Sequence, residues 1–192
     1  PLDLVANLTP AEEVSGDFYD YFPLDENRVL LAVADVSGKG MPAALFMSMG
    51  RALLRQVGKG NDRPAEILSE LNEGISRDNP KFMFVTMVLA VYDVVSGECV
   101  VARAGHPAPL LRLADGKVSE LGCDTGSLVG IAEDCPPFAE SKLRLGHGDT
   151  LILYTDGLTE AANLSTGEMF GTNRLVTLTG QIRQGAPLQE YL

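Results

Sequence analysis

Three aspartates of this chain share one local pattern, a carboxylate close to a glycine at or near the end of an apolar run. They are Asp17 in VSGDFYD, Asp35 in VADVSGKG and Asp156 in LILYTDGLTE. Small neighbours let a ligand approach closely, and an apolar strand fixes the direction of the carboxylate. Three carboxylates aimed at one point repel one another, and they become favourable when Mg²⁺ or Mn²⁺ lies between them. The combination therefore indicates a metal centre.

Each aspartate taken alone also has a structural interpretation. Asp-Gly is a common turn sequence, which favours a plain turn at Asp156. Asp35 or Ser37 could cap the helix that the following residues predict. Only the occurrence of all three in order along the chain favours the metal interpretation, and both interpretations stay open at this point.

The composition fits one globular domain and argues against two classes of partner. The chain has 192 residues, 45% of them hydrophobic, which is enough for a sizeable core. Its 15 Lys and Arg against 26 Asp and Glu give a net charge of −11, and no basic run offers a track for nucleic-acid phosphates. The longest apolar run, 82–92, is about half of a membrane span, so we expect no transmembrane segment.

The order of apolar patterns and turn signals predicts an α+β domain with antiparallel sheets. Two amphipathic helices interrupt the strands, one beginning near Pro42 and one over 64–76. The segment 114–138, rich in Gly, Pro, Asp and Ser, is expected to be a long loop and a candidate flap. The expected strands are 2–8, 14–22, 28–35, 84–92, 98–104, 109–113, 142–145 and 150–155.

The apolar stripes of the two helices are expected to face a sheet. The stripe of the first helix consists of Leu45, Met49, Ala52 and Leu53. The methionines of this segment are expected to fill the core; they are Met41, Met47 and Met49. The stripe of the second helix consists of Ile67, Leu68, Leu71 and Ile75.

Five collinear stretches resemble the sporulation and stress-response branch of the bacterial PPM (protein phosphatase 2C-like) serine/threonine phosphatases. They are EEVSGDFYDYF, LLAVADVSGKGMPAALFMSMGRALLR, FVTMVLAVYDVVSGECVVARAGHPAPLL, LRLGHGDTLILYTDGLTEAAN and MFGTNRL. The resemblance runs from about residue 5 to residue 175. It implies an α-β-β-α sandwich of two antiparallel sheets flanked by helices, and a metal-dependent protein phosphatase in bacterial signal transduction.

The resemblance also implies roles for four residues. Asp17, Asp35 and Asp156 take the places of catalytic metal ligands, and Asp35 bridges both ions. The Val36 carbonyl takes the place of a backbone ligand. Two Mn²⁺ or Mg²⁺ ions about 4 Å apart would activate a water molecule that attacks phosphorus in line. The implied substrate is a phosphoserine or phosphothreonine on a signalling protein, in this branch an anti-sigma-factor antagonist.

Two departures from the family pattern bear on these expectations. Ser15-Gly16-Asp17 stands where many relatives have Gly-Gly-Asp, a small-for-small change. A further ligating Asp on a last strand has no counterpart here, which suggests a domain cut from a longer protein with an N-terminal sensor or receiver module. The alternative function is an inactive phosphatase-like module that binds a signalling partner, and a homodimer stays open.

Other reactive residues have plainer interpretations. We expect His106 to support a proline-framed corner and His147 to be solvated. Lys39 is expected to be an exposed turn residue. Asp20 and Glu160 are expected to be surface residues in preference to metal ligands acting through water. The odd cysteine number indicates a reducing compartment, and hence a cytoplasmic protein, with inert thiols; they are Cys99, Cys123 and Cys135.

Overall fold

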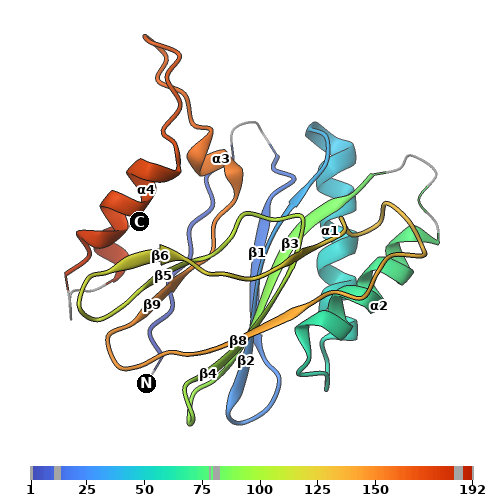
Figure 1. The fold of residues 1–192 in the computed structure, drawn as a ribbon. Coiled ribbons are helices and arrows are strands. Elements are labelled where there is room, and N and C mark those ends of the chain that lie inside the picture. Colours follow the sequence, from blue (N-terminus) through green and yellow to red (C-terminus); the bar gives the residue numbers. More distant parts are fainter. Residues whose placement is uncertain (1, 11–13, 78, 80–82, 184–187, 192) are drawn as a thin grey trace. The chain divides into compact units, whose positions relative to one another are not determined.

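The computed structural model describes residues 2–10, 14–77, 79, 83–183 and 188–191. Within these ranges the chain forms two compact units (Figure 1). The larger unit comprises residues 8–106 and 123–144, and the smaller unit comprises 1–7, 107–122 and 145–192. Each unit has its own sheet and helices, in agreement with the predicted α+β class.

The larger unit is built on a sheet in which consecutive strands are antiparallel neighbours, in the order β1-β2-β3-β4. Two later strands both pair with β4, β7 in parallel and β8 antiparallel. Side-chain carboxylates close the hairpin turns, as at Asp93, whose Oδ1 accepts the N–H groups of Val95 and Ser96. The strands are β1 (Phe18–Pro23), β2 (Arg28–Val36), β3 (Val85–Asp93), β4 (Glu98–Ala104), β7 (Thr125–Gly126) and β8 (Glu140–Arg144).

Helices α1 (Gly40–Val57) and α2 (Pro64–Ser76) lie on one side of this sheet (Figure 1). Alternate residues of β2 enter the core that these helices cover, whereas Asp35 is on the other face of the strand. The predicted stripe of α2 is confirmed, because all four of its apolar residues are buried. The strand residues in this core are Leu30, Ala32, Ala34 and Val36 from β2 and Val85, Met87, Leu89 and Val91 from β3.

The predicted stripe of α1 is wrong for most of its members. Leu45 and Met49 are 65% and 46% exposed, Met41 is 63% exposed, and Ala52 is also exposed. The buried line is Ala43, Gly50 and Leu54, with Phe46, Met47, Leu53 and Val57 partly buried against the core. Two of the buried positions carry small residues, Ala43, which lies near Gly16, and Gly50, which lies near Ile75 of α2, so the side with the smaller residues is the buried one.

Two other sequence predictions need correction. Residues 2–8 are not a strand, and the strand predicted over 14–22 begins only at Phe18. The segment 114–138 is not one long loop, because it contains β6 (Val118–Glu120) and β7, and Val129 forms a bridge with Val85. Asn72 of α2 is hydrogen-bonded to the later part of the segment 114–138. Its side chain donates to Ala132 O at 2.8 Å and accepts from the Gly130 N–H at 2.8 Å.

The smaller unit has a sheet in the order β6-β5-β9, with antiparallel pairs on both sides of β5. Its buried cluster contains Leu110, Tyr154 and Leu175. The remaining elements are β5 (Leu110–Arg112), β9 (Thr150–Ile152), α3 (Asp156–Thr159), α4 (Thr172–Gly180) and the 3-10 helix η1 (Leu188–Tyr191). Across the described ranges, no helix combines the length and the apolar character needed to cross a membrane.

Candidate metal centre

Asp17 and Asp35 come together at one end of the β1–β2 pair in the larger unit. The register pairs Phe18 with Ala34, and the two aspartates are the next residue on each chain. Both are partly buried. Asp17 precedes β1, and its N–H donates to Ser15 Oγ at 3.0 Å, which turns the chain into the strand.

The absence of a side chain at Gly16 lets the backbone approach the carbonyl of Val36. A Cβ atom on Gly16 would lie 3.0 Å from Val36 O and 3.6 Å from Ala43 Cβ. The position therefore favours glycine because of a close backbone contact. Two carboxylates and a carbonyl are oxygen donors of the kind that Mg²⁺ and Mn²⁺ prefer, so the donor set of this unit fits such an ion.

Thr86 of β3 lies next to Asp35, and His106, two residues after the end of β4, contacts Thr86. The β2–β3 register places Thr86 directly opposite Asp35. Thr86 Oγ1 lies 2.8 Å from Nδ1 of His106, a hydrogen bond whose direction depends on the tautomer. His106 is only 2% exposed, so its predicted structural role at a corner agrees with its burial.

The backbone on both sides of His106 is firmly held. Gly105 has φ +63°, and its N–H donates to Thr125 Oγ1 at 2.9 Å. Arg103 donates from Nη1 to His106 O and from Nη2 to Cys123 O, both at 2.7 Å. A partly buried guanidinium that satisfies two carbonyl groups fixes the geometry of the chain around His106.

Asp156 belongs to the smaller unit, where it is the first residue of α3 and is exposed. Its backbone carbonyl accepts from the Glu160 N–H at 2.7 Å. In the part of the chain that the structure describes, no group of three or more His, Cys, Asp or Glu side chains could hold a metal ion. Within one unit, the predicted ligand set thus comes together only in part, as Asp17, Asp35 and the Val36 carbonyl.

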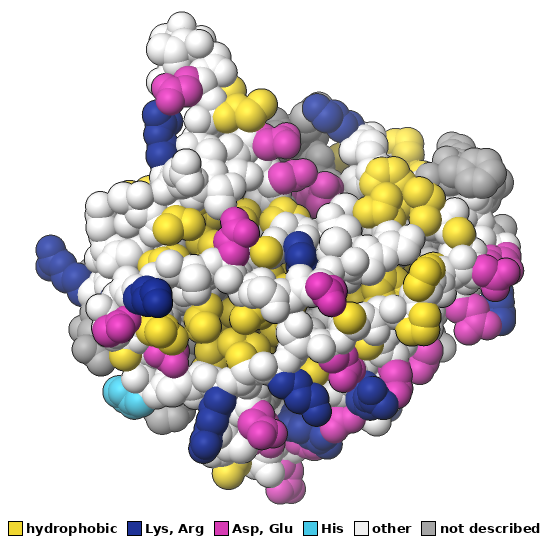
Figure 2. Space-filling model, viewed as in Figure 1, with side chains coloured by type: hydrophobic (Ala, Val, Ile, Leu, Met, Phe, Trp, Pro, Cys, Tyr) yellow, Lys and Arg dark blue, Asp and Glu magenta, His cyan; other side chains and the backbone are white. Residues whose placement is uncertain are grey.

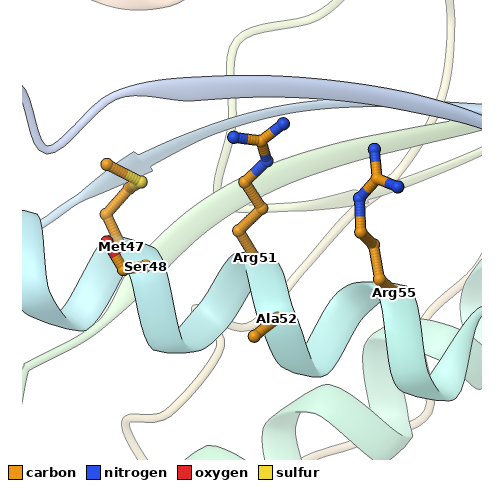
Figure 3. Close-up of a pocket in the computed structure, with 5 residues that line it drawn as sticks. All are labelled: Met47, Ser48, Arg51, Ala52 and Arg55. Atoms are coloured by element: carbon orange, nitrogen blue, oxygen red, sulfur yellow. The ribbon is translucent and has the colours of Figure 1, made fainter.

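Asp20 is neither the surface residue nor the metal ligand that the sequence suggested. It is 4% exposed and is held by two arginines of α1, with Arg55 Nη2 at 2.6 Å and Arg51 Nε at 3.1 Å. Figure 3 shows both arginines extending from one side of α1, beside a hollow of about 300 Å³ that they line with Met47, Ser48 and Ala52. Burial opposes ionisation of Asp20, but the hydrogen bonds from Arg55 and Arg51 outweigh it, so the pKa of Asp20 lies below its ordinary value.

The other weighed residues agree with their plain interpretations. Lys39, His147 and Glu160 are exposed. The three cysteines are free thiols, and burial raises the pKa of Cys99 to about 12, which makes it unreactive. On the face drawn in Figure 2, the described Lys and Arg side chains lie among Asp and Glu side chains.

Sequence reasoning missed Thr86, Arg51 and Arg55. The arginines are spaced i, i+4 on the helix, which places them on one face, but only the packing of α1 against β1 brings Asp20 to them. Thr86 interrupts the apolar run of β3, and a hydroxyl in such a run is a signal for a polar contact.

The described fold is that of a PP2C-like phosphatase domain. The model of the family "Stage II sporulation protein E (SpoIIE)" matches residues 25–192, and the chain belongs to this family. "Phosphoserine phosphatase RsbU" of Bacillus subtilis is 34% identical over 160 residues, which cover 83% of this chain and 47% of RsbU. The chain therefore spans about half of this curated relative.

Solved structures show the same fold. The SiaA-PP2C domain of Pseudomonas aeruginosa matches with a TM-score of 0.79 and 26% identity, covering 92% of this chain and 69% of that one. The RsbU and RsbW domains of Rv1364c from Mycobacterium tuberculosis match with a TM-score of 0.77 and 27% identity. The match covers 95% of this chain and 49% of that one. The predicted family and fold class are confirmed, and the predicted enzyme class, a protein serine/threonine phosphatase, is that of these relatives.

Proposed function

We propose that this domain is a metal-dependent phosphatase that removes phosphate from phosphoserine or phosphothreonine on a signalling protein. One observation carries the proposal. Asp17 and Asp35 lie at the same end of the β1–β2 pair, and Gly16 lies close to the Val36 carbonyl. The phosphoserine phosphatase RsbU, with its 34% identity, supports the same activity.

In this proposal each residue has one role at the metal centre. Asp35, Asp17 and the Val36 carbonyl of the larger unit would hold the Mn²⁺ or Mg²⁺ ions, with Asp35 as the shared ligand, and Asp156 of the smaller unit is kept as a proposed metal ligand. When bound, the ions neutralise phosphate charge and activate the attacking water. The aspartates hold this charge at the strand ends, so an acidic protein can receive an anionic substrate without a cluster of Lys or Arg.

The substrate that we infer is a phosphorylated anti-sigma-factor antagonist or a similar phosphoprotein. The inference follows from the family resemblance and from the identity with RsbU. We also propose that the domain works in the cytoplasm. A further proposal is that it is fused to a regulatory module in a longer protein, since the chain covers only 47% of RsbU.

The test is hydrolysis of a phosphoserine protein and of p-nitrophenyl phosphate, with Mn²⁺ and with EDTA. We expect turnover with Mn²⁺, loss of turnover with EDTA, and loss of turnover in Asp35→Asn at every Mn²⁺ concentration. Asp124→Asn, which changes an exposed aspartate, is the matched control and should behave as wild type. Hydrolysis that continues in EDTA would contradict the metal-dependent mechanism, and tight binding of the phosphoprotein without turnover would favour the inactive binding module.

A further inference from the structure

Asp35 and Thr86 are directly opposed residues on the face of the larger sheet that points away from the core under α1 and α2. Their chain neighbours Ala34, Val36, Val85 and Met87 all point into that core. Directly opposed side chains of an antiparallel pair have their Cβ atoms about 4.5–5.5 Å apart, so Thr86 stands next to the Asp35 carboxylate.

The Thr86 side chain has little freedom. It is β-branched, which restricts rotation about χ1, and its hydroxyl is bonded to His106 Nδ1 at 2.8 Å. A threonine hydroxyl has one hydrogen to donate and two lone pairs, so the bond to His106 leaves it capacity for the neighbouring carboxylate.

His106 is itself fixed by contacts that do not involve Asp35. Gly105 forms a bridge with Met87 of β3, and a Cβ atom on Gly105 would lie 2.2 Å from Leu128 Cδ2. Together with the Arg103 bond to the His106 carbonyl, these contacts hold the backbone that carries the imidazole. His106 therefore restrains the Thr86 side chain through their hydrogen bond, and Thr86 lies opposite Asp35 at the strand end.

We infer that Thr86 and His106 are positioning residues, which orient the Asp35 carboxylate for cation binding. The inference rests on the proposed metal centre and adds two residues that contribute no ligand atom to it. Groups that orient a metal ligand change metal affinity by about 10- to 100-fold when they are removed. A purely structural pair would change the stability of the fold and leave the metal affinity of the folded protein unchanged.

The experiment measures Mn²⁺ affinity by calorimetric titration of the metal-free 192-residue chain. Thr86→Val removes the hydroxyl at nearly constant shape, and Thr86→Ser keeps it. We expect Thr86→Val to weaken Mn²⁺ binding by about 10- to 100-fold and Thr86→Ser to stay within about threefold of wild type. Thr177→Val is the matched control, because the hydroxyl of this exposed residue in α4 bonds only to Asn173 O at 2.8 Å.

A second pair of variants keeps the test decisive if Thr86→Val is poorly folded. His106→Asn retains a polar group near the position of Nδ1, and His106→Leu does not, so only His106→Leu should weaken Mn²⁺ binding. Melting temperatures in EDTA and in Mn²⁺ are recorded for every variant, and the rise that Mn²⁺ produces should be smaller in Thr86→Val and His106→Leu.

The outcomes separate this inference from the proposed function. If wild type binds Mn²⁺ and Asp35→Asn does not, while folded Thr86→Val binds as wild type does, the positioning role is overturned and the metal centre stands. If wild type and Asp35→Asn bind Mn²⁺ equally, the metal centre itself is wrong and the positioning role falls with it.

Discussion

Arg55 of α1 binds both carboxylate oxygens of Asp20 in β1 through one edge of its guanidinium, with Nη2 2.6 Å from Oδ1 and Nε 2.7 Å from Oδ2. The two-point contact joins the helix to the first strand of the sheet, three residues after Asp17. Arg51 adds two longer hydrogen bonds to the same carboxylate, from Nε at 3.1 Å and from Nη2 at 3.4 Å, so the helix is fixed at two successive turns.

Asp20→Asn should destabilise the fold by about 1–3 kcal/mol at pH 7, since it removes the charge that two arginines bind. The pKa of Asp20 is lower in the folded state than the unfolded value of about 3.9. The unfolded chain therefore binds more protons at low pH, and the stability supplied by Asp20 is lost as the pH falls through about 4 and below.

Urea unfolding of wild type and Asp20→Asn between pH 3 and pH 7 measures this effect. The difference in unfolding free energy between the two should shrink as the pH falls. Asp124→Asn, an exposed site, should show no such difference. A constant difference across this pH range would mean that the charge of Asp20 is not what stabilises the fold.

Asp35→Asn should abolish Mn²⁺-dependent hydrolysis and leave the melting temperature in EDTA within about 3 °C of wild type, a change of under 1 kcal/mol. The reason is that Asp35 would, in our proposal, ligate both ions, whereas a helix cap tolerates Asn well. Near-normal turnover by the folded variant would remove the basis for the two-ion centre.

Gly16→Ala should weaken Mn²⁺ binding although it changes no ligand atom. The new Cβ would be 3.0 Å from Val36 O, so the backbone at Asp17 must shift away from β2. We expect the Mn²⁺ affinity to fall about tenfold or more, as for other changes next to a metal ligand. Gly146→Ala, at an exposed turn of the smaller unit, serves as the control, and equal Mn²⁺ affinity in both variants would show that the close approach has no role in binding.

His106→Ala should lower the unfolding free energy by about 2–4 kcal/mol, because a fully buried side chain is lost and Thr86 loses its partner. At saturating Mn²⁺ the turnover number should fall less than tenfold, since His106 touches Thr86 and not the reacting phosphate in our proposal. A large loss of turnover at an unchanged melting temperature would instead make His106 a catalytic residue.

Much of the fold could be predicted because local patterns and tertiary packing agree. The second helix is a clear case, because its apolar residues form a single stripe and Pro64 marks its start. The first helix carries apolar residues on more than one side, and periodicity alone does not decide which side is buried. In that helix the side with the small residues Ala43 and Gly50 is buried. The prediction chose the side with the large apolar residues Leu45 and Met49, which are exposed.

The sequence predicted Asp17 and Asp35 as candidate ligands, but it did not predict the residues that surround them. Asp17 and Asp35 stand at sequence patterns that hold carboxylates at strand ends, and the register brings them to one place. Thr86 and Arg51 depend on pairings between segments far apart in the chain. Such contacts are set by strand register and helix docking, which no local pattern encodes.

The pairing of β4 with both β7 and β8 has a consequence for synthesis of the protein. As the chain leaves the ribosome, β1 to β4 emerge first, and the outer edge of β4 has neither of these partners until residues 125–126 and 140–144 follow. Open sheet edges pair readily with other chains, so this edge is the place where nascent molecules would aggregate. A stop placed after Ala104 should therefore give an insoluble product, because this edge then never receives its partners.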